Sequence, residues 1–148
     1  MLRNHNEIGY FILVGDKENW EIAIENKIWG FTNNSKGFWN TLEVDDLLAF
    51  YSTRPIKKIF GFGRVIEKFT DDELLWSDEQ VFKRVLWPLR IRFEILFLLE
   101  NWNAGEELPK LNLRTPRVNI DKKFFLKIVK QMEKKHNIQI LKQNSWNN

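Results

Sequence analysis

The run from Leu89 to Leu99 constrains the fold more than any other feature of this sequence, because it is the longest stretch with a β-type pattern. Within it the charged residues Arg90, Arg92 and Glu94 alternate with Ile91, Phe93 and Ile95. Successive side chains of a strand point to opposite faces, so this alternation predicts a sheet with one face in the core. The other face is predicted to be hydrated and basic.

Further apolar runs bounded by turn residues are also typical of strands. They are Gly9–Val14, Leu47–Tyr51, Ile59–Ile66 and, as an edge strand, Ile138–Leu141. The second and third are joined by a polar segment of the kind found at hairpin tips. Gly61 and Gly63 inside the third indicate a bulge or a close backbone approach.

Helical spacing is clearest after Asp121, which can cap a helix with apolar side chains on one face. Those side chains are Phe124, Phe125, Ile128, Val129 and Met132. A capping box from Thr70 to Glu73 predicts a short helical turn that carries Trp76.

A shorter helix is expected to end near Asn26, with Asp16 or Asn19 as its cap. The segments Thr32–Gly37 and Asn101–Arg117 are rich in turn residues and predict loops. Together these elements predict an α+β fold, in which a small twisted β-barrel-like sheet has a few helices packed outside it.

The 148-residue chain, with 43% hydrophobic residues, has enough apolar side chains for one core. We expect one domain over residues 1–142 and a polar tail or linker at residues 143–148. No run reaches the roughly 18 apolar residues of a membrane helix, and Met1–Tyr10 has no signal-peptide core. A cytoplasmic protein without a membrane partner is therefore expected.

Motifs for catalysis are almost absent. The chain has no cysteine and two histidines, which excludes disulfides, thiolate zinc sites and cysteine nucleophiles. Gly61-Phe62-Gly63 lacks the third glycine of a dinucleotide fingerprint. His136 ends a lysine-rich helix, where a solvated or cationic ring is favoured. We therefore expect no enzymatic activity, no bound metal and no cofactor.

Aromatic residues make up 14% of the chain, with seven Trp and twelve Phe. Indoles are costly to bury completely and are suited to stacking on flat ligands. Charge is uneven: residues 1–80 hold 9 Lys and Arg against 14 Asp and Glu (net −5), and residues 81–148 hold 14 against 6 (net +8). The C-terminal half is therefore a candidate surface for a polyanion.

Asn19, at a helix start, is followed ten residues later by Trp29-Gly30 at the exit into a polar loop. This pattern resembles the YTH and EVE branches of the PUA-like superfamily, in which these positions belong to a pocket for a methylated base. Trp76 follows at the expected interval, and Asn112–Val118 is similar to the basic loop that holds the nucleic-acid backbone. The resemblance covers residues 10–135 and implies a PUA-like fold.

The resemblance leans to the EVE branch, because Gly30 stands where a small hydroxyl residue is usual and Trp20 where an aliphatic one is. Similar domains occur alone and as N-terminal specificity modules of McrBC-type modification-dependent restriction systems. The polar ending at Asn148 fits a module that is followed by an effector domain or joined by a partner subunit. The implied partner is methylated nucleic acid, with DNA favoured and N6-methyladenine ahead of 5-methylcytosine.

In the implied pocket Trp29 and Trp76 sandwich a flipped or unpaired base, and each stack is worth about 1 to 3 kcal/mol. A buried methyl adds only about 0.8 kcal/mol, so selectivity requires a polar edge, for which Asn19 is the candidate. Gly30 and Trp39, which lies beside the polar loop, complete the predicted base-binding set. Three other tryptophans, Trp20, Trp87 and Trp102, are expected in the core or at its rim. The alternative is that Trp29 and Trp76 are also core residues and Asn19 only caps a helix.

Five basic residues are candidates for contacts with phosphates: Lys36, Arg90, Arg92, Arg114 and Arg117. For each of them the alternative is a solvated surface position. Two other functions stay open at this point. One is a module for modified RNA with the same cage, and the other is a small-molecule or protein-interaction domain whose cage takes a free nucleotide or a cation.

Overall fold

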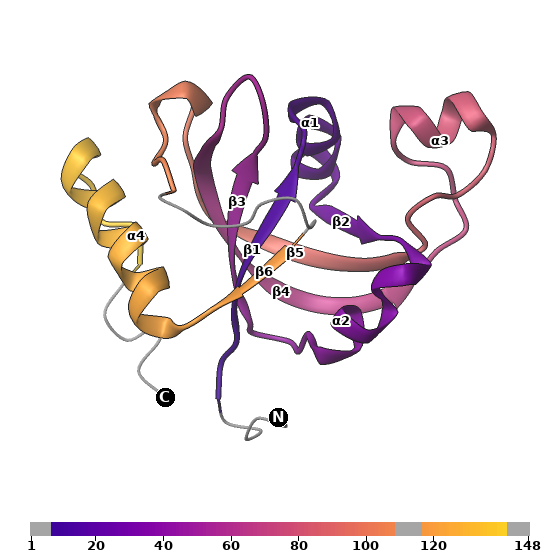
Figure 1. The fold of residues 1–148 in the computed structure, drawn as a ribbon, viewed down its shortest axis with the longest axis horizontal. Helices are drawn as coiled ribbons and strands as arrows, with labels where there is room; N and C mark the ends of the chain where they lie inside the picture. The colour runs from indigo at the N-terminus through magenta and orange to yellow at the C-terminus, as the bar shows by residue number, and fades with distance from the viewer. Residues whose placement is uncertain (1–6, 109–116, 142–148) are drawn as a thin grey trace.

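A computed structural model describes residues 7–108 and 117–141, and its centre is one sheet of six strands in the order β2-β5-β4-β3-β1-β6 (Figure 1). The strands are β1 (Tyr10–Gly15), β2 (Ile28–Phe31), β3 (Leu47–Ser52), β4 (Lys58–Thr70), β5 (Leu89–Leu98) and β6 (Arg117–Ile120). The α-helices are α1 (Lys17–Asn26), α2 (Lys36–Thr41), α3 (Ser77–Phe82) and α4 (Lys122–His136). Short 3₁₀ turns cover Asn33–Ser35 and Trp102–Ala104.

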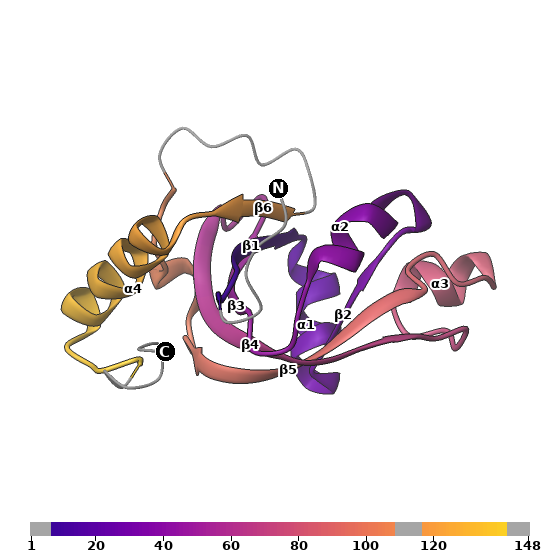
Figure 2. The same cartoon turned by 90° about the horizontal axis from the view of Figure 1, so that it is seen from below.

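The sheet is mixed and strongly curled. β1 and β3 run parallel, and all other neighbouring strands run antiparallel. Register shifts interrupt the β4–β5 pairing at Phe62/Gly63 and Val65/Glu67, which fits the bulge predicted from the glycines. Figure 2 shows the long β4 and β5 bending around the other elements. The predicted α+β class with a barrel-like sheet is confirmed.

Two cores lie on opposite faces of β1. Tyr10, Ile12 and Val14 pack in the core that contains α4, whereas Phe11 and Leu13 pack in the core that contains α1. Figures 1 and 2 place α4 at one side of the molecule and α1, α2 and α3 at the other. A strand buried on both faces explains why the sequence here is an unbroken apolar run.

The caps predicted for the first and last helices are present, with Asp16 rather than Asn19 capping the first. The Asp16 carboxylate accepts a hydrogen bond from the Asn19 N–H (2.8 Å), and the Asp121 carboxylate accepts one from the Phe124 N–H (2.7 Å). Lys27 and Asn137, just past the two helices, adopt left-handed φ values of 58° and 53°. No helix in the described part of the chain combines the length and the apolar character needed to cross a bilayer.

The predicted loop Thr32–Gly37 is wrong, because a 3₁₀ turn and the start of α2 occupy it. Its turn-rich composition is overridden by tertiary packing: the Phe38 ring lies 5.3 Å from the Phe11 ring and 5.5 Å from the Phe31 ring. The short helix after β4 begins at Ser77 instead of within the predicted box.

The predictions for the C-terminal region are also corrected in two places. Ile138–Leu141 is not a strand; the N–H groups of Ile140 and Leu141 instead donate to the Glu133 carboxylate. Arg117, expected as the last residue of a loop, instead begins β6, which pairs with β1. The division at residue 142 lies at the edge of the described residues and stays a prediction.

Alkaline pH is expected to destabilise the fold through two buried phenols. Burial, and then the charge of Asp46, raises the pKa of Tyr10; burial, and then Glu107, raises the pKa of Tyr51. A raised pKa in the folded state means that this stability is complete below the ordinary phenol pKa and is lost as the pH rises above it. Urea unfolding from about pH 9 to about pH 11 should show a smaller loss for Tyr10→Phe/Tyr51→Phe than for wild type.

Candidate functional site

A cavity of about 170 Å³ lies where the end of β1, the start of α1, β2 and the segments flanking α3 meet. Its lining is mostly apolar and contains three tryptophans. The lining residues are Val14, Gly15, Asn19, Trp29, Gly30, Phe31, Thr32, Trp76 and Trp87. Four residues of the predicted base-binding set, Asn19, Trp29, Gly30 and Trp76, are therefore brought together around one space.

Trp29 lines this cavity. One face of its ring stacks on Trp20, with ring centroids 4.0 Å apart and planes 19° from parallel. Gly15 lies against the edge of the same indole, so close that a side chain at this position would collide with Trp29. Trp29 is only 5% exposed, and its position is fixed before any ligand binds.

Trp76 is the second wall, and it stands nearly perpendicular to the first. The centroids of Trp29 and Trp76 are 6.5 Å apart with planes at 80°. The predicted sandwich between these two rings is therefore wrong, because a planar base cannot lie parallel to both. The Trp76 indole N–H donates to the Asn19 backbone carbonyl (3.1 Å), which ties this wall to α1.

Trp87, expected in the core or at its rim, is a third wall. It is half-buried, and its ring meets Trp76 at 5.5 Å and 74°. The planes of Trp29 and Trp87 are thus both steeply inclined to the plane of Trp76, and all three residues line the cavity. Trp76 and Trp87 lie on opposite sides of α3 in the sequence, and this shared segment is the signal that identifies Trp87.

Gly30 allows these rings to approach the sheet. A Cβ at this position would lie 2.7 Å from Trp87 Cβ and 2.8 Å from Trp76 Cη2, well inside van der Waals contact. Gly30 pairs with Arg90 across β2 and β5, so the rings pack over the backbone at that register position. Any side chain here would displace a cavity wall.

Two residues that line the cavity carry polar groups with free hydrogen-bonding capacity. The Trp29 indole nitrogen is buried and has no partner among the described residues. Within the same residues the Asn19 side-chain amide makes no hydrogen bond, and Asn19 is half-buried in the first turn of α1. A buried donor without an acceptor costs about 1 to 3 kcal/mol, so this arrangement favours a ligand that supplies one.

Trp39 does not line the cavity, and its predicted role as a wall is wrong. Its indole N–H donates to the Arg90 backbone carbonyl (3.0 Å), and the Lys68 ammonium lies 4.8 Å above its ring. Trp39 therefore packs α2 against β5.

Arg90 is not a phosphate contact, contrary to the sequence prediction. It is 1% exposed and forms an ion pair with the fully buried Glu79 at 3.3 Å. The alternating pattern of β5 placed it correctly on the face opposite Ile91, but the segment around α3 covers that face at this point. Arg92 is exposed, and it pairs with Glu67 at 2.8 Å.

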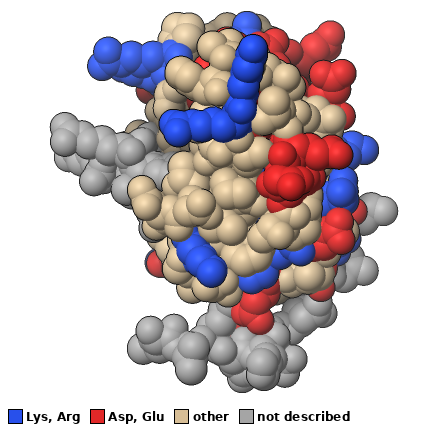
Figure 3. Space-filling view, turned by 90° about the vertical axis from the view of Figure 1, so that its right-hand side faces the viewer, with Lys and Arg blue, Asp and Glu red and all other residues tan. Residues whose placement is uncertain are grey.

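The other predicted phosphate contacts stay predictions. Lys36 is exposed at the start of α2. Arg114 and the side chain of Arg117 lie outside what the structure describes. On the face that carries α3, Lys and Arg stand toward one upper side and Asp and Glu toward the other, with mostly uncharged surface between them (Figure 3). Further Lys and Arg lie at the right-hand edge and in the lower part of this face, so its positive charge is scattered and does not form a continuous basic groove.

No family model matches the chain, and no curated protein is detectably similar in sequence. Solved structures share its fold. The YTH domain-containing protein mmi1, in a complex with RNA, has 15% identity and a TM-score of 0.58, over 90% of this chain and 92% of that one. The Pho92 YTH domain, in complex with m6A, has 14% identity and a TM-score of 0.57, over 87% and 86%.

An ASCH protein from Zymomonas mobilis has 11% identity and a TM-score of 0.54, over 82% of this chain and 94% of that one. YTH and ASCH domains are both PUA-like, so the predicted PUA-like fold is confirmed. At these identities the comparisons establish the fold alone.

Proposed function

We propose that this domain is a reader that binds one modified base of a nucleic acid in the tryptophan-lined cavity. The observation that carries the proposal is the combination of three indole walls with a buried, unpartnered indole N–H on one of them. The cavity, at about 170 Å³, is smaller than the roughly 300 to 1,000 Å³ of drug-sized ligand pockets. It suits a single base better than a larger ligand.

Stacking supplies the affinity in this arrangement. The base lies against the open face of Trp29, with Trp87 opposite and Trp76 as the floor. Each base–aromatic stack is worth about 1 to 3 kcal/mol, which offsets the few kcal/mol needed to extrude a base from a duplex. A methyl group that reaches the floor adds about 0.8 kcal/mol.

Hydrogen bonds supply the selectivity. The Trp29 N–H donates to an acceptor of the base, and the Asn19 amide can both donate and accept. A base that lacks the matching edge leaves these groups unpaired, which is more costly than the loss of a methyl contact.

We propose binding without catalysis. No residue that lines the cavity in the described chain is a carboxylate, histidine or lysine. General acid–base chemistry requires such a titratable group within hydrogen-bond reach. The lining instead consists of rings, small residues and neutral polar groups.

The mmi1 structure contains RNA and the Pho92 structure contains m6A, so these fold relatives support RNA with an N6-methylated adenine as the ligand. The preference for DNA, and the McrBC-type role, rest on the sequence resemblance alone. We therefore propose methylated RNA as the ligand and include DNA as a comparison in the test.

Four matched oligonucleotides test the proposal: RNA and DNA of one sequence, each with and without one N6-methyladenine. Fluorescence anisotropy should show methylated RNA binding at least about tenfold tighter than unmethylated RNA, a difference of about 1.4 kcal/mol. Tighter binding to methylated DNA than to methylated RNA would instead support the preference for DNA that the sequence resemblance implies. Equal affinity for all four would contradict the reader function and favour a small-molecule or protein ligand.

A Trp29→Phe variant tests the indole donor separately from the stack. It keeps an aromatic ring but removes the N–H, so affinity for methylated RNA should fall about two- to tenfold, as expected for one hydrogen bond. Trp102→Phe is the matched control, because Trp102 stacks on Phe60 at 3.9 Å and does not line the cavity. A similar loss in both variants would exclude a specific role for the Trp29 N–H.

A further inference from the structure

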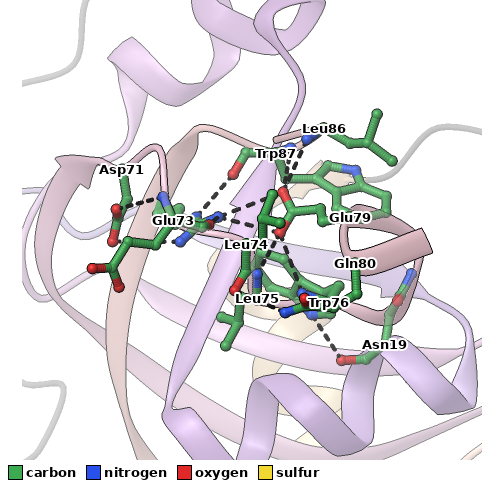
Figure 4. Close-up of polar contacts among 11 residues, drawn as sticks. Asn19, Asp71, Glu73, Leu74, Leu75, Trp76, Glu79, Gln80, Leu86 and Trp87 are labelled. Atoms are coloured by element: carbon green, nitrogen blue, oxygen red, sulfur yellow. Dashed lines mark hydrogen bonds and ion pairs between the residues drawn. The ribbon is translucent and has the colours of Figure 1, made fainter. Parts of the chain in front are cut away.

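A buried carboxylate and a buried guanidinium lie beside the cavity but do not line it. Glu79 of α3 is 0% exposed and Arg90 of β5 is 1% exposed, and they form an ion pair at 3.3 Å. Figure 4 shows Glu79 in a network of polar contacts that includes Trp76 and Trp87. Since charged groups are rarely buried without a specific use, this pair requires an explanation.

The Glu79 carboxylate binds the backbone on both sides of α3. One oxygen accepts from the N–H groups of Leu75 (2.8 Å) and Trp76 (3.2 Å). The other accepts from the N–H groups of Leu86 (2.9 Å) and Trp87 (3.1 Å). A single side chain therefore fixes the backbone at two of the three cavity walls.

Arg90 completes this network from the sheet. Its Nε donates to the Trp87 carbonyl (2.9 Å), and one terminal nitrogen donates to the Glu73 carbonyl (2.7 Å). The other terminal nitrogen lies 3.4 Å from the Asp71 carboxylate. The guanidinium is also 5.2 Å from the centre of the Trp76 ring, and so supports the face of that wall.

The Glu79–Arg90 pair contributes more to the geometry of the cavity than to the free energy of unfolding. Desolvation of two charges offsets most of their attraction, so a buried ion pair contributes little net folding free energy compared with apolar residues of similar volume. What the pair provides is geometry, because its hydrogen bonds, apart from those between the two side chains, fix backbone groups of the segment that carries Trp76 and Trp87.

We infer that Glu79 and Arg90 are positioning residues that hold Trp76 and Trp87 in the binding arrangement before the ligand arrives. This inference rests on the proposed base-binding function. A preformed cavity loses less conformational entropy on binding, so the pair raises affinity without touching the base.

Glu79→Gln tests the inference with a minimal change of shape. The new NH₂ group faces two backbone N–H groups that it cannot accept from, so one wall segment loses its anchor. Affinity for the N6-methylated RNA oligonucleotide should fall at least about tenfold. Amide hydrogen exchange at Trp76 and Trp87, or at their neighbours Leu75 and Leu86, should accelerate while circular dichroism shows a retained fold.

Glu67→Gln is the matched control, since Glu67 of β4 pairs with Arg92 on β5, the strand that also carries Arg90, but its side chain is 51% exposed. It should keep the wild-type affinity within about twofold, as expected for a surface ion pair. If Glu79→Gln does not fold, Arg90→Lys replaces it, because lysine keeps the charge but loses the forked contacts with the Trp87 and Glu73 carbonyls.

The outcomes separate this inference from the proposed function. Wild-type protein that binds no oligonucleotide would overturn the function, and the positioning role with it. Wild-type binding together with unchanged binding by a folded Glu79→Gln or Arg90→Lys variant would overturn only the positioning role. The positioning role would also be overturned if the loss of affinity in the variant matched its unfolded fraction, as measured by urea titration.

Discussion

A Gly30→Ala variant is expected to lose about a hundredfold in affinity for methylated RNA, close to 2.7 kcal/mol. The added methyl would lie 2.7 Å from Trp87 Cβ and within 2.9 Å of two Trp76 ring atoms. Trp76 cannot move freely, because its indole is hydrogen-bonded to Asn19 and supported by Arg90. The methyl must therefore shift a cavity wall, and the stacking geometry is lost.

Gly37→Ala is the control for this substitution. Gly37 lies in α2, and a Cβ there meets nothing within 4 Å. Alanine in a helix is favoured over glycine by roughly 0.5 to 1 kcal/mol, so this variant should be slightly more stable and should bind as wild type does. Anisotropy titrations on both variants provide the comparison. If Gly30→Ala bound as tightly as Gly37→Ala, Trp76 and Trp87 would not be walls of the binding site.

The elements that the sequence predicted well are those set by local pattern and burial. The run that became β1 is apolar throughout because the strand is buried on both faces. The final helix has both a capping Asp121 and a complete apolar face, and it was predicted almost to its ends. Where packing of distant residues decides the structure, as at Phe38 in α2, turn-rich composition was misleading.

Arg90 shows why strand alternation identifies a face but not its environment. The pattern assigns alternate residues to one side of β5 and cannot show that a segment seventeen residues earlier covers that side at one end only. Arg92, two residues further on, is exposed as predicted. Glu79 was not predicted as a buried residue, because nothing in the sequence around it distinguishes a buried acid from a surface one.

The sequence predicted which residues form the site better than it predicted their arrangement. Asn19, Trp29, Gly30 and Trp76 were grouped by resemblance to a family pattern, and the structure places all four at one cavity. The angle between the Trp29 and Trp76 rings could not be predicted from the sequence, because it depends on how β2 and the segment around α3 cross. That angle excludes a sandwich between Trp29 and Trp76, so the proposed binding mode takes Trp87 as the wall opposite Trp29 and Trp76 as the floor.

Trp20→Ala is expected to cost about 3 to 5 kcal/mol of unfolding free energy, the range for loss of a large buried aromatic side chain. Trp20 is fully buried, stacks on Trp29 and donates its indole N–H to the Tyr51 carbonyl at 2.8 Å. Since the total free energy of unfolding of a small domain is only about 5 to 15 kcal/mol, the variant should be close to unfolding at room temperature. Urea titration monitored by far-UV circular dichroism measures the loss.

Trp20→Phe separates packing from the hydrogen bond. It keeps a ring against Trp29 but leaves the Tyr51 carbonyl without its donor, so the loss should be smaller, about 1 to 3 kcal/mol. The folded fraction of this variant should still bind methylated RNA, because Trp20 supports the far face of Trp29 and does not line the cavity. If Trp20→Ala cost no more than Trp20→Phe, the indole stack would not hold Trp29 in place, and another contact would have to fix that wall.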